Sequence, residues 1–328
     1  MKALIHTDFG PPDVLRLADV EKPSPKPREV LVQVRAAAVN PLDWHLLRAE
    51  PNVLKLMGRP EASGRIPGVD VAGEVEAVGA KVIAFHPGDQ VFGTCKGAFA
   101  EYVCGKETRF AAKPVGLTHA QAAAIPVAGC TALQALRDHG RLQRGQHVLV
   151  NGAAGGVGTF AVQIAKALGA HVTGVCSTRN VDLVRSIGAD HVVDYTAEDF
   201  TQHEGRYDLI VKVAGTRSVA AMRKALAPRG TLVVVGGGVG RATDDGTGLL
   251  ELLNLMVGGR VLSPFVRQRC VMFIAQSRQS DLVLLSGLTE AGHVTPVIDR
   301  TYALADVPEA IRYLEAGHAR GKVVIAVE

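Results

Sequence analysis

A glycine-rich stretch, NGAAGGVG at residues 151–158, lies between an apolar run and an amphipathic run. The first run is typical of a strand and the second of a helix. The first N–H groups of a helix have no partner within it, and its partial positive charge favours a phosphate. The backbone of Ala154, Gly155, Gly156 and Val157 is therefore expected to bind a pyrophosphate, with Gly158 allowing close helix packing. A turn with packing value only is the alternative, which the surrounding alternation of strands and helices disfavours.

Small polar residues end the second strand of this region. In NAD-selective folds, an Asp or Glu about 20 residues after the turn binds the ribose 2′-OH. Here the chain has Ser177, Thr178, Arg179 and Asn180, with no carboxylate. Hydroxyls, an amide and a guanidinium suit a 2′-phosphate, which a carboxylate would repel. The pattern favours NADPH, and the alternative is that Arg179 is only a solvated loop residue.

Strands and helices alternate through the second half of the chain. The strands are nearly all apolar, which indicates a parallel sheet covered on both faces. They are expected at 147–150, 171–175, 191–193, 207–213 and 231–236, with 269–275 as a sixth.

The first 120 or so residues are different, with short β-branched runs separated by Pro/Gly turns, as in a compact β-barrel. Strands are expected there at 2–5, 29–39, 71–78 and 90–93, and Thr118 and Gln121 predict a capping box at the start of a helix. Strands at 294–299 and 322–327 are expected to rejoin this region. The predicted domains are 1–122 with 276–328, and 123–275.

Composition excludes several classes of partner. The 328 residues are 47% hydrophobic and 21% charged, with a net charge of +4. No dense Lys/Arg cluster indicates nucleic acid or a membrane surface, and no apolar stretch reaches the ~18 residues of a membrane span. Five scattered cysteines without a CxxC pair predict a reducing cytoplasm.

Several segments, taken in order, resemble the zinc-independent quinone oxidoreductase branch of the medium-chain dehydrogenase/reductase superfamily. They are AVNPLDW (38–44), IPGVDVAGEVEAVG (66–79), GDQVFG (88–93), GAFAEYV (97–103), GCTALQAL (129–136), AAGGVG (153–158), GADHVVDY (188–195) and GKVVIAV (321–327). The resemblance implies a GroES-like β domain and a Rossmann domain with the active site between them. It also implies a homodimer that pairs the strand near 270–275 across subunits.

The three positions that hold the catalytic zinc ligands in the zinc members correspond to Asn40, Val69 and Val127. A zinc site requires Cys, His or carboxylate ligands, and the lobe that holds a structural zinc is also missing. Neither a catalytic nor a structural zinc is therefore expected, which removes the Lewis acid of an alcohol dehydrogenase.

The resemblance also assigns cofactor contacts. Asn40 and Thr131 would lie near the nicotinamide, and Tyr195 at the adenosine end, unless it is a loop aromatic that covers the sheet. The remaining assigned contacts are Gly236 and Gly237 near the nicotinamide ribose, and Lys322, whose alternative is a solvated lysine at a strand start.

Without zinc, hydride transfer to a quinone or an α,β-unsaturated carbonyl fits best, since hydrogen bonds can stabilise the oxygen that gains charge. Asn40 and His45 are the candidate catalytic residues, because an imidazole with its ordinary pKa of about 6.5 can donate a proton near neutral pH. His45 on a helix surface, or water as the proton source, are the alternatives. Lys212 could add positive charge near the cofactor, and the 48–64 segment is expected to shape substrate choice.

Two other functions stay open at this stage. One is metal-free NADP-dependent oxidation of alcohols or reduction of ketones. The other is NADPH binding with little catalysis, as in crystallin relatives of this branch.

Overall fold

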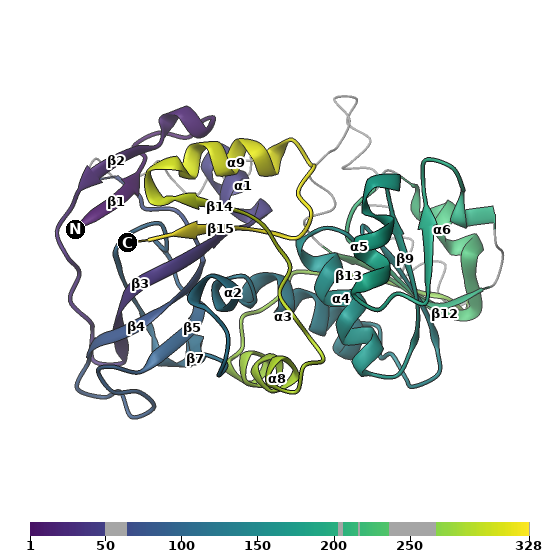
Figure 1. The fold of residues 1–328 in the computed structure, drawn as a ribbon, viewed down its shortest axis with the longest axis horizontal. Helices are drawn as coiled ribbons and strands as arrows, with labels where there is room; N and C mark the ends of the chain where they lie inside the picture. Colours follow the sequence, from purple (N-terminus) through teal and green to yellow (C-terminus); the bar gives the residue numbers. More distant parts are fainter. Residues whose placement is uncertain (50–63, 203–205, 216, 236–266, 328) are drawn as a thin grey trace. The chain divides into compact units, whose positions relative to one another are not determined.

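The computed structural model describes residues 1–49, 64–202, 206–215, 217–235 and 267–327 (Figure 1). Its chain contacts divide it into two compact units. Unit 1 consists of Met1–Cys130, Ser277–Gly292 and Pro296–Glu328, and unit 2 of Thr131–Gln276 and His293–Thr295. The first division falls after Cys130, inside a helix, whereas the sequence placed it after residue 122.

Unit 1 is built on a seven-stranded sheet with the order β14-β15-β3-β4-β5-β7, in which β6 also pairs with β3. Strands β1 and β2 form a separate antiparallel pair. The strands are β1 (Lys2–Ile5), β2 (Arg16–Asp19), β3 (Glu29–Val39), β4 (Asp70–Val78), β5 (Gln90–Thr94), β6 (Tyr102–Lys106), β7 (Phe110–Ala112), β14 (Ile298–Ala303) and β15 (Lys322–Ala326). The C-terminal strands thus rejoin the N-terminal sheet, as expected from the sequence.

Strand β3 is central to this sheet because it pairs with β4, β6 and β15. Its apolar residues are buried in one core with the equally buried Phe99 and Phe110. The helices of unit 1 are α1 (Pro41–Arg48), α2 (His119–Ala123), α8 (Gln279–Glu290) and α9 (Val307–Glu315). Helix α2 begins with the predicted capping box, in which the Gln121 backbone N–H donates to Thr118 Oγ1 over 3.2 Å and the Thr118 N–H to Gln121 Oε1 over 3.0 Å.

Unit 2 is built on six parallel strands in the order β10-β9-β8-β11-β12-β13. Counted from β8, this is the 3-2-1-4-5-6 order of a doubly wound Rossmann sheet, and the predicted fold class is confirmed. The strands are β8 (His147–Asn151), β9 (His171–Cys176), β10 (His191–Asp194), β11 (Tyr207–Lys212), β12 (Leu226–Val235) and β13 (Arg269–Phe273). The helices are α4 (Gly156–Ala167), α5 (Val181–Ser186) and α6 (Val219–Ala225), while α3 (Pro126–Gln134) runs from unit 1 into unit 2.

One strand lies later in the chain than expected. The sequence placed a strand at 294–299, but β14 begins at Ile298. Thr295 is instead held by Gln163 of α4, whose Nε2 donates to the Thr295 carbonyl and whose Oε1 accepts from its N–H. The apolar pattern alone does not reveal this contact, so the expected start was wrong by several residues.

Two other expectations concern residues outside the described part of the chain, namely most of the 48–64 segment and the pair Gly236 and Gly237. Among the described residues, no helix combines the length and the apolar character needed to cross a bilayer.

Candidate active site

The glycine-rich turn joins β8 to α4, with Gly155 at the N-cap. Gly152 has a φ of +92°, a left-handed backbone that favours glycine. A Cβ on Gly158 would lie 2.0 Å from the Gly152 carbonyl oxygen, so only glycine allows α4 to lie this close to the turn. A Cβ on Gly155 would meet nothing nearer than 3.6 Å, which leaves room for a ligand atom at the helix start. The turn therefore has the shape and the donors that a pyrophosphate requires.

The end of β9 turns directly into a short 3-10 helix, Thr178–Asn180, with Ser177 at its N-cap. Asn180 donates from Nδ2 to Ser177 Oγ over 3.2 Å, and Thr178 Oγ1 lies 3.0 Å from Thr196 Oγ1. The buried Oδ1 of Asn180 has no hydrogen-bond partner among the described residues. A buried amide oxygen in this state suits a hydroxyl donor such as that of a ribose. Arg179 is exposed at the same strand end.

The structure also places a carboxylate here that the sequence analysis missed. Asp194 ends β10, and its register partner on β9 is Cys176, next to Ser177. Its Oδ1 accepts from the Thr196 hydroxyl over 2.7 Å. Hydrogen bonds from Thr178 and then Thr196 lower the pKa of Asp194. The parallel pairing of β10 with β9 places the last residue of β10 beside the end of β9, and taking this pairing into account would have identified Asp194.

Tyr195 follows Asp194, and its N–H donates to the Cys176 carbonyl over 3.0 Å. Its side chain is 55% exposed. It therefore lies at the same strand end as Ser177, and its contact with a cofactor stays a prediction.

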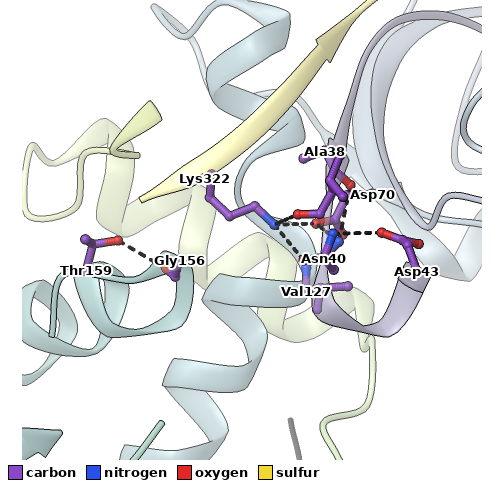
Figure 2. A network of polar contacts seen from close by, with 9 residues as sticks. Ala38, Asn40, Asp43, Asp70, Val127, Gly156, Thr159 and Lys322 are labelled. Carbon is purple, nitrogen blue, oxygen red and sulfur yellow. Dashed lines mark hydrogen bonds and ion pairs between the residues drawn. The ribbon is translucent and has the colours of Figure 1, made fainter. Parts of the chain in front are cut away.

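Unit 1 contains a buried polar cluster formed by Asn40, Asp43, Asp70 and Lys322, all at most 3% exposed (Figure 2). Lys322 Nζ donates to Asn40 Oδ1 over 2.6 Å and lies 3.2 Å from Asp70 Oδ2. Asn40 Nδ2 donates to the same Asp70 oxygen over 2.9 Å and to the Ala38 carbonyl over 3.3 Å. The ammonium is therefore held by a carboxylate and an amide at once.

Asp70 also connects the cluster to a helix. Its second oxygen, Oδ1, accepts from the backbone N–H of Val127 in the first turn of α3, over 2.9 Å. Thr131 lies one turn farther along α3 and is 5% exposed. Asp70 thus joins strand β4, strand β15 and helix α3.

Asp43 completes the cluster from the first turn of α1. Its Oδ2 accepts from the Asn40 backbone N–H over 2.7 Å, whereas its buried Oδ1 has no hydrogen-bond partner among the described residues. Burial is the main cause that raises the pKa of Asp43 to about 7, and the negative charge of Asp70 adds to it. Asp43 is therefore an acid that titrates near neutral pH.

Asp70 differs from Asp43 in the number of its donors. Burial raises the pKa of Asp70 above its usual value, whereas the Lys322 ammonium, the Asn40 amide and the Val127 N–H oppose that rise. Three donors directed at one carboxylate favour its charged form. Lys322 and Asp70 consequently balance each other's charge, and any ionisation of Asp43 adds an excess negative charge.

Strand pairing brings the members of this cluster together. Ala38 of β3 is in register with Asp70 of β4, and Val39 is in register with Val323 of β15. Asp70 and Lys322 are the first residues of their strands, and Asn40 is the N-cap of α1. The sequence analysis assigned roles to Asn40 and Lys322 but none to Asp70. The missed signal is an Asp at the first position of a strand, followed directly by the uncharged residues Val71, Ala72 and Gly73.

Two further residues with predicted roles, His45 and Lys212, lie in separate environments. The His45 ring is half-buried and stacked on Trp44, with ring centroids 3.6 Å apart, and Trp44 packs against the core. Lys212 ends β11, is 6% exposed and donates to the Arg217 carbonyl over 3.2 Å. Their proposed chemical roles stay predictions.

The metal-ligand positions of the zinc members carry no metal-binding side chain here, since a Val side chain has no donor atom and Asn40 is bound to Lys322. Within the described ranges, no group of three or more His, Cys, Asp and Glu residues is arranged to hold a metal ion.

Comparisons with known proteins give a consistent relationship. Residues 26–115 match the family described as alcohol dehydrogenase GroES-like domain, and residues 187–325 match the family described as zinc-binding dehydrogenase. The mitochondrial NAD(P)H oxidoreductase RTN4IP1 of Mus musculus is 35% identical over 92% of this chain and 82% of its own. The 2-methylene-furan-3-one reductase of Solanum lycopersicum is 34% identical over 99% of this chain and 79% of its own. The solved structure of a quinone oxidoreductase from Coxiella burnetii has a TM-score of 0.84 and 30% identity, covering 100% of this chain and 99% of that one.

The three ligand positions, Asn40, Val69 and Val127, lie outside the residues 187–325 that match the family with the zinc-binding description. The chain belongs to the medium-chain dehydrogenase/reductase superfamily, in its zinc-independent quinone oxidoreductase branch.

Proposed function

We propose that the protein is an NADPH-dependent oxidoreductase that reduces quinones or α,β-unsaturated carbonyls without a metal ion. The observation that carries the proposal is the polar end of β9, where Asn180 Nδ2 donates to Ser177 Oγ beside the exposed Arg179. Together with the glycine-rich turn, this end offers donors for a pyrophosphate and for a 2′-phosphate. The named activities of the three relatives agree with this reaction class.

NADPH would be held in unit 2 by the backbone of 154–157 and by Ser177, Thr178, Arg179 and Asn180, with Tyr195 at the adenosine end. Thr131, Asn40, Lys322 and the pair Gly236 and Gly237 are proposed contacts toward the nicotinamide. When bound, the cofactor supplies a hydride, and the chain orients it and its acceptor.

The chain's own chemistry at the acceptor is electrostatic. Lys322 Nζ donates to Asn40 Oδ1 and to Asp70 Oδ2, and Asn40 Nδ2 donates to the same Asp70 oxygen, so these residues act as a fixed, preorganised group and not as proton donors. The final proton then comes from water or from His45. Replacing His45 by Gln distinguishes these sources, because kcat should fall only if the histidine donates the proton.

The test of the function is a direct one. NADPH and NADH are titrated by calorimetry, and cofactor oxidation is then followed with a panel of quinones, enones and simple ketones. We expect tighter NADPH binding and turnover with quinones or enones. Turnover with ketones only, or NADPH binding without any turnover, would contradict the proposal.

We also propose a homodimer that extends the Rossmann sheet through β13. This strand is last in the order of described strands in its sheet, and Ile274 just beyond it is 86% exposed. Light scattering should give the mass of a dimer, and Ile274→Asp should lower it to that of a monomer.

We propose the cytoplasm as location, because none of the five cysteines forms a disulfide in the structure, which is typical of a reducing compartment. Cell fractionation tests this placement, and recovery in an organelle or an oxidising compartment would contradict it.

A further inference from the structure

The buried cluster of unit 1 contains a carboxylate, Asp70, to which no role in the reaction has been assigned. Asp70 is fully buried, and both of its oxygens are used. Oδ2 binds the Lys322 ammonium and the Asn40 amide, and Oδ1 binds the Val127 N–H of α3. No other residue of the cluster touches all three of these partners.

A positioning role follows from what Lys322 would do without this carboxylate. A lysine has four rotatable side-chain bonds and a strongly hydrated ammonium, so an unpaired one moves toward water or loses its proton when buried. Without Asp70, the Lys322 ammonium would be held by two neutral oxygens, Asn40 Oδ1 at 2.6 Å and the Val39 carbonyl at 3.4 Å. Asp70 adds the opposite charge, which keeps the ammonium in the site.

We propose that Asp70 is a positioning residue for the reduction, one that holds in fixed positions the Lys322 ammonium and the Asn40 amide, two of the proposed contacts toward the nicotinamide. This inference rests on the proposed function. In that reaction the acceptor carbon would gain a hydride from bound NADPH in a new C–H bond, and NADP⁺ would be left. The acceptor's π electrons move to its carbonyl oxygen, and a proton from solvent neutralises this oxygen. A fixed ammonium stabilises the negative charge that develops there.

The position of Asp43 gives this proposal a distinct readout. The charged groups that face Asp43 from other elements are Asp70 on β4 and Lys322 on β15, and farther along α1 Arg48 is paired with Glu315 of α9. Cys95 lies within electrostatic range of Asp70, and burial raises the pKa of its thiol, so it stays neutral in this range. Ionisation of Asp43 adds one negative charge to the cluster, which opposes charge build-up on the acceptor.

The wild-type rate should therefore fall as pH rises through neutrality. In Asp70→Asn, Asp43 no longer faces a second carboxylate and becomes the counter-ion of Lys322. Its ionisation moves to lower pH, and the fall in rate should move with it.

The experiment compares pH profiles of kcat and KM for NADPH-dependent quinone reduction in the wild type, Asp70→Asn, Asp43→Asn and the control Glu76→Gln. Glu76 lies on the same strand but is exposed and paired with Lys22. We expect Asp70→Asn to lose about tenfold or more in kcat, with the KM for NADPH within about twofold of wild type, because the cofactor phosphates are held by unit 2. The fall in rate should move to lower pH in Asp70→Asn and disappear in Asp43→Asn.

Wild-type kcat and profile in Asp70→Asn would overturn the proposal, as would a loss of kcat with an unmoved profile, which indicates a packing role. If Asp70→Asn does not fold, an unchanged fall in rate in Asp43→Asn overturns the proposal by itself. If the wild type shows no turnover, both the proposed function and the Asp70 assignment are wrong. If the wild type turns over but the variants do not behave as expected, only the Asp70 assignment is wrong.

Discussion

Charged side chains are buried in one region of the molecule and exposed in another. In unit 1, Lys322 and Asp70 are almost fully buried and form an ion pair, with 3.2 Å between Lys322 Nζ and Asp70 Oδ2. In unit 2, Thr178 and Arg179 are exposed at a strand end, where Thr178 donates a hydrogen bond to the Asp194 carboxylate. A buried pair depends on its partner because water cannot replace it, whereas exposed groups can be solvated when a partner is lost. Changes in the first region should therefore affect folding and catalysis together, and changes in the second only ligand affinity.

The largest expected effect is on Lys322. Lys322→Met leaves Asp70 buried without its counter-ion and should lower the free energy of unfolding by about 3–5 kcal/mol. The double variant Asp70→Asn/Lys322→Met removes both charges and should be closer to wild type than Lys322→Met. Urea unfolding followed by the fluorescence of Trp44, the single tryptophan, reports on unit 1.

A matched control is Lys22→Met, which breaks the exposed pair with Glu76 and should cost less than about 1 kcal/mol. If the double variant is less stable than Lys322→Met alone, the mutual dependence of the buried charges is wrong.

The next effect in size concerns pH. Folded Asp43 keeps its proton up to about pH 7, whereas the unfolded chain releases it near pH 4. The folded state thus binds more protons in this window, so its stability falls as pH rises from about 4 to 7, by up to about 1.4 kcal/mol per pH unit. Asp43→Asn should remove this contribution and gain stability relative to wild type with rising pH.

Unfolding measured at several pH values checks this, with Asp182→Asn as a control at a fully exposed side chain. A stability difference between Asp43→Asn and wild type that is constant with pH would show that Asp43 is ionised throughout.

The smallest effect is expected at the exposed strand end. Arg179→Ala should weaken NADPH binding by about 1–2 kcal/mol, roughly tenfold, and leave NADH binding unchanged, because only NADPH carries the 2′-phosphate. Calorimetry at two salt concentrations should show the loss shrinking as salt screens the charge. The control Arg185→Ala, on α5, removes a guanidinium that is paired with Asp182 and should change neither affinity. Equal losses for both dinucleotides would place Arg179 away from the 2′-phosphate.

The two regions also differ in how far the sequence could predict them. The turn before α4 and the end of β9 are local, so their residues could be identified from spacing alone. The buried cluster joins residues far apart in the chain, since Asn40 and Asp70 are 30 positions apart and Asp70 and Lys322 are 252 apart. Only the register of β3 with β4 and β15 brings them together, and this register depends on tertiary packing. Asp194 beside Thr178 was missed for the same reason.

Strands and helices with a buried face were predictable because the apolar residues of that face recur at the period of the element. The strands 29–39 and 322–327 and the capping box at Thr118 lie as predicted. The start of β14 was not predictable, because a side-chain contact from Gln163 holds the apolar residues that precede it.

The most direct test of the central claim, that the buried cluster of Lys322, Asp70 and Asn40 serves the reduction without a metal ion, is metal analysis combined with activity after chelation. The protein is dialysed against a strong chelator, its zinc content is measured, and NADPH-dependent quinone reduction is assayed before and after. The account predicts far less than one zinc per chain and an unchanged rate. One tightly bound zinc per chain whose removal abolishes turnover would contradict it.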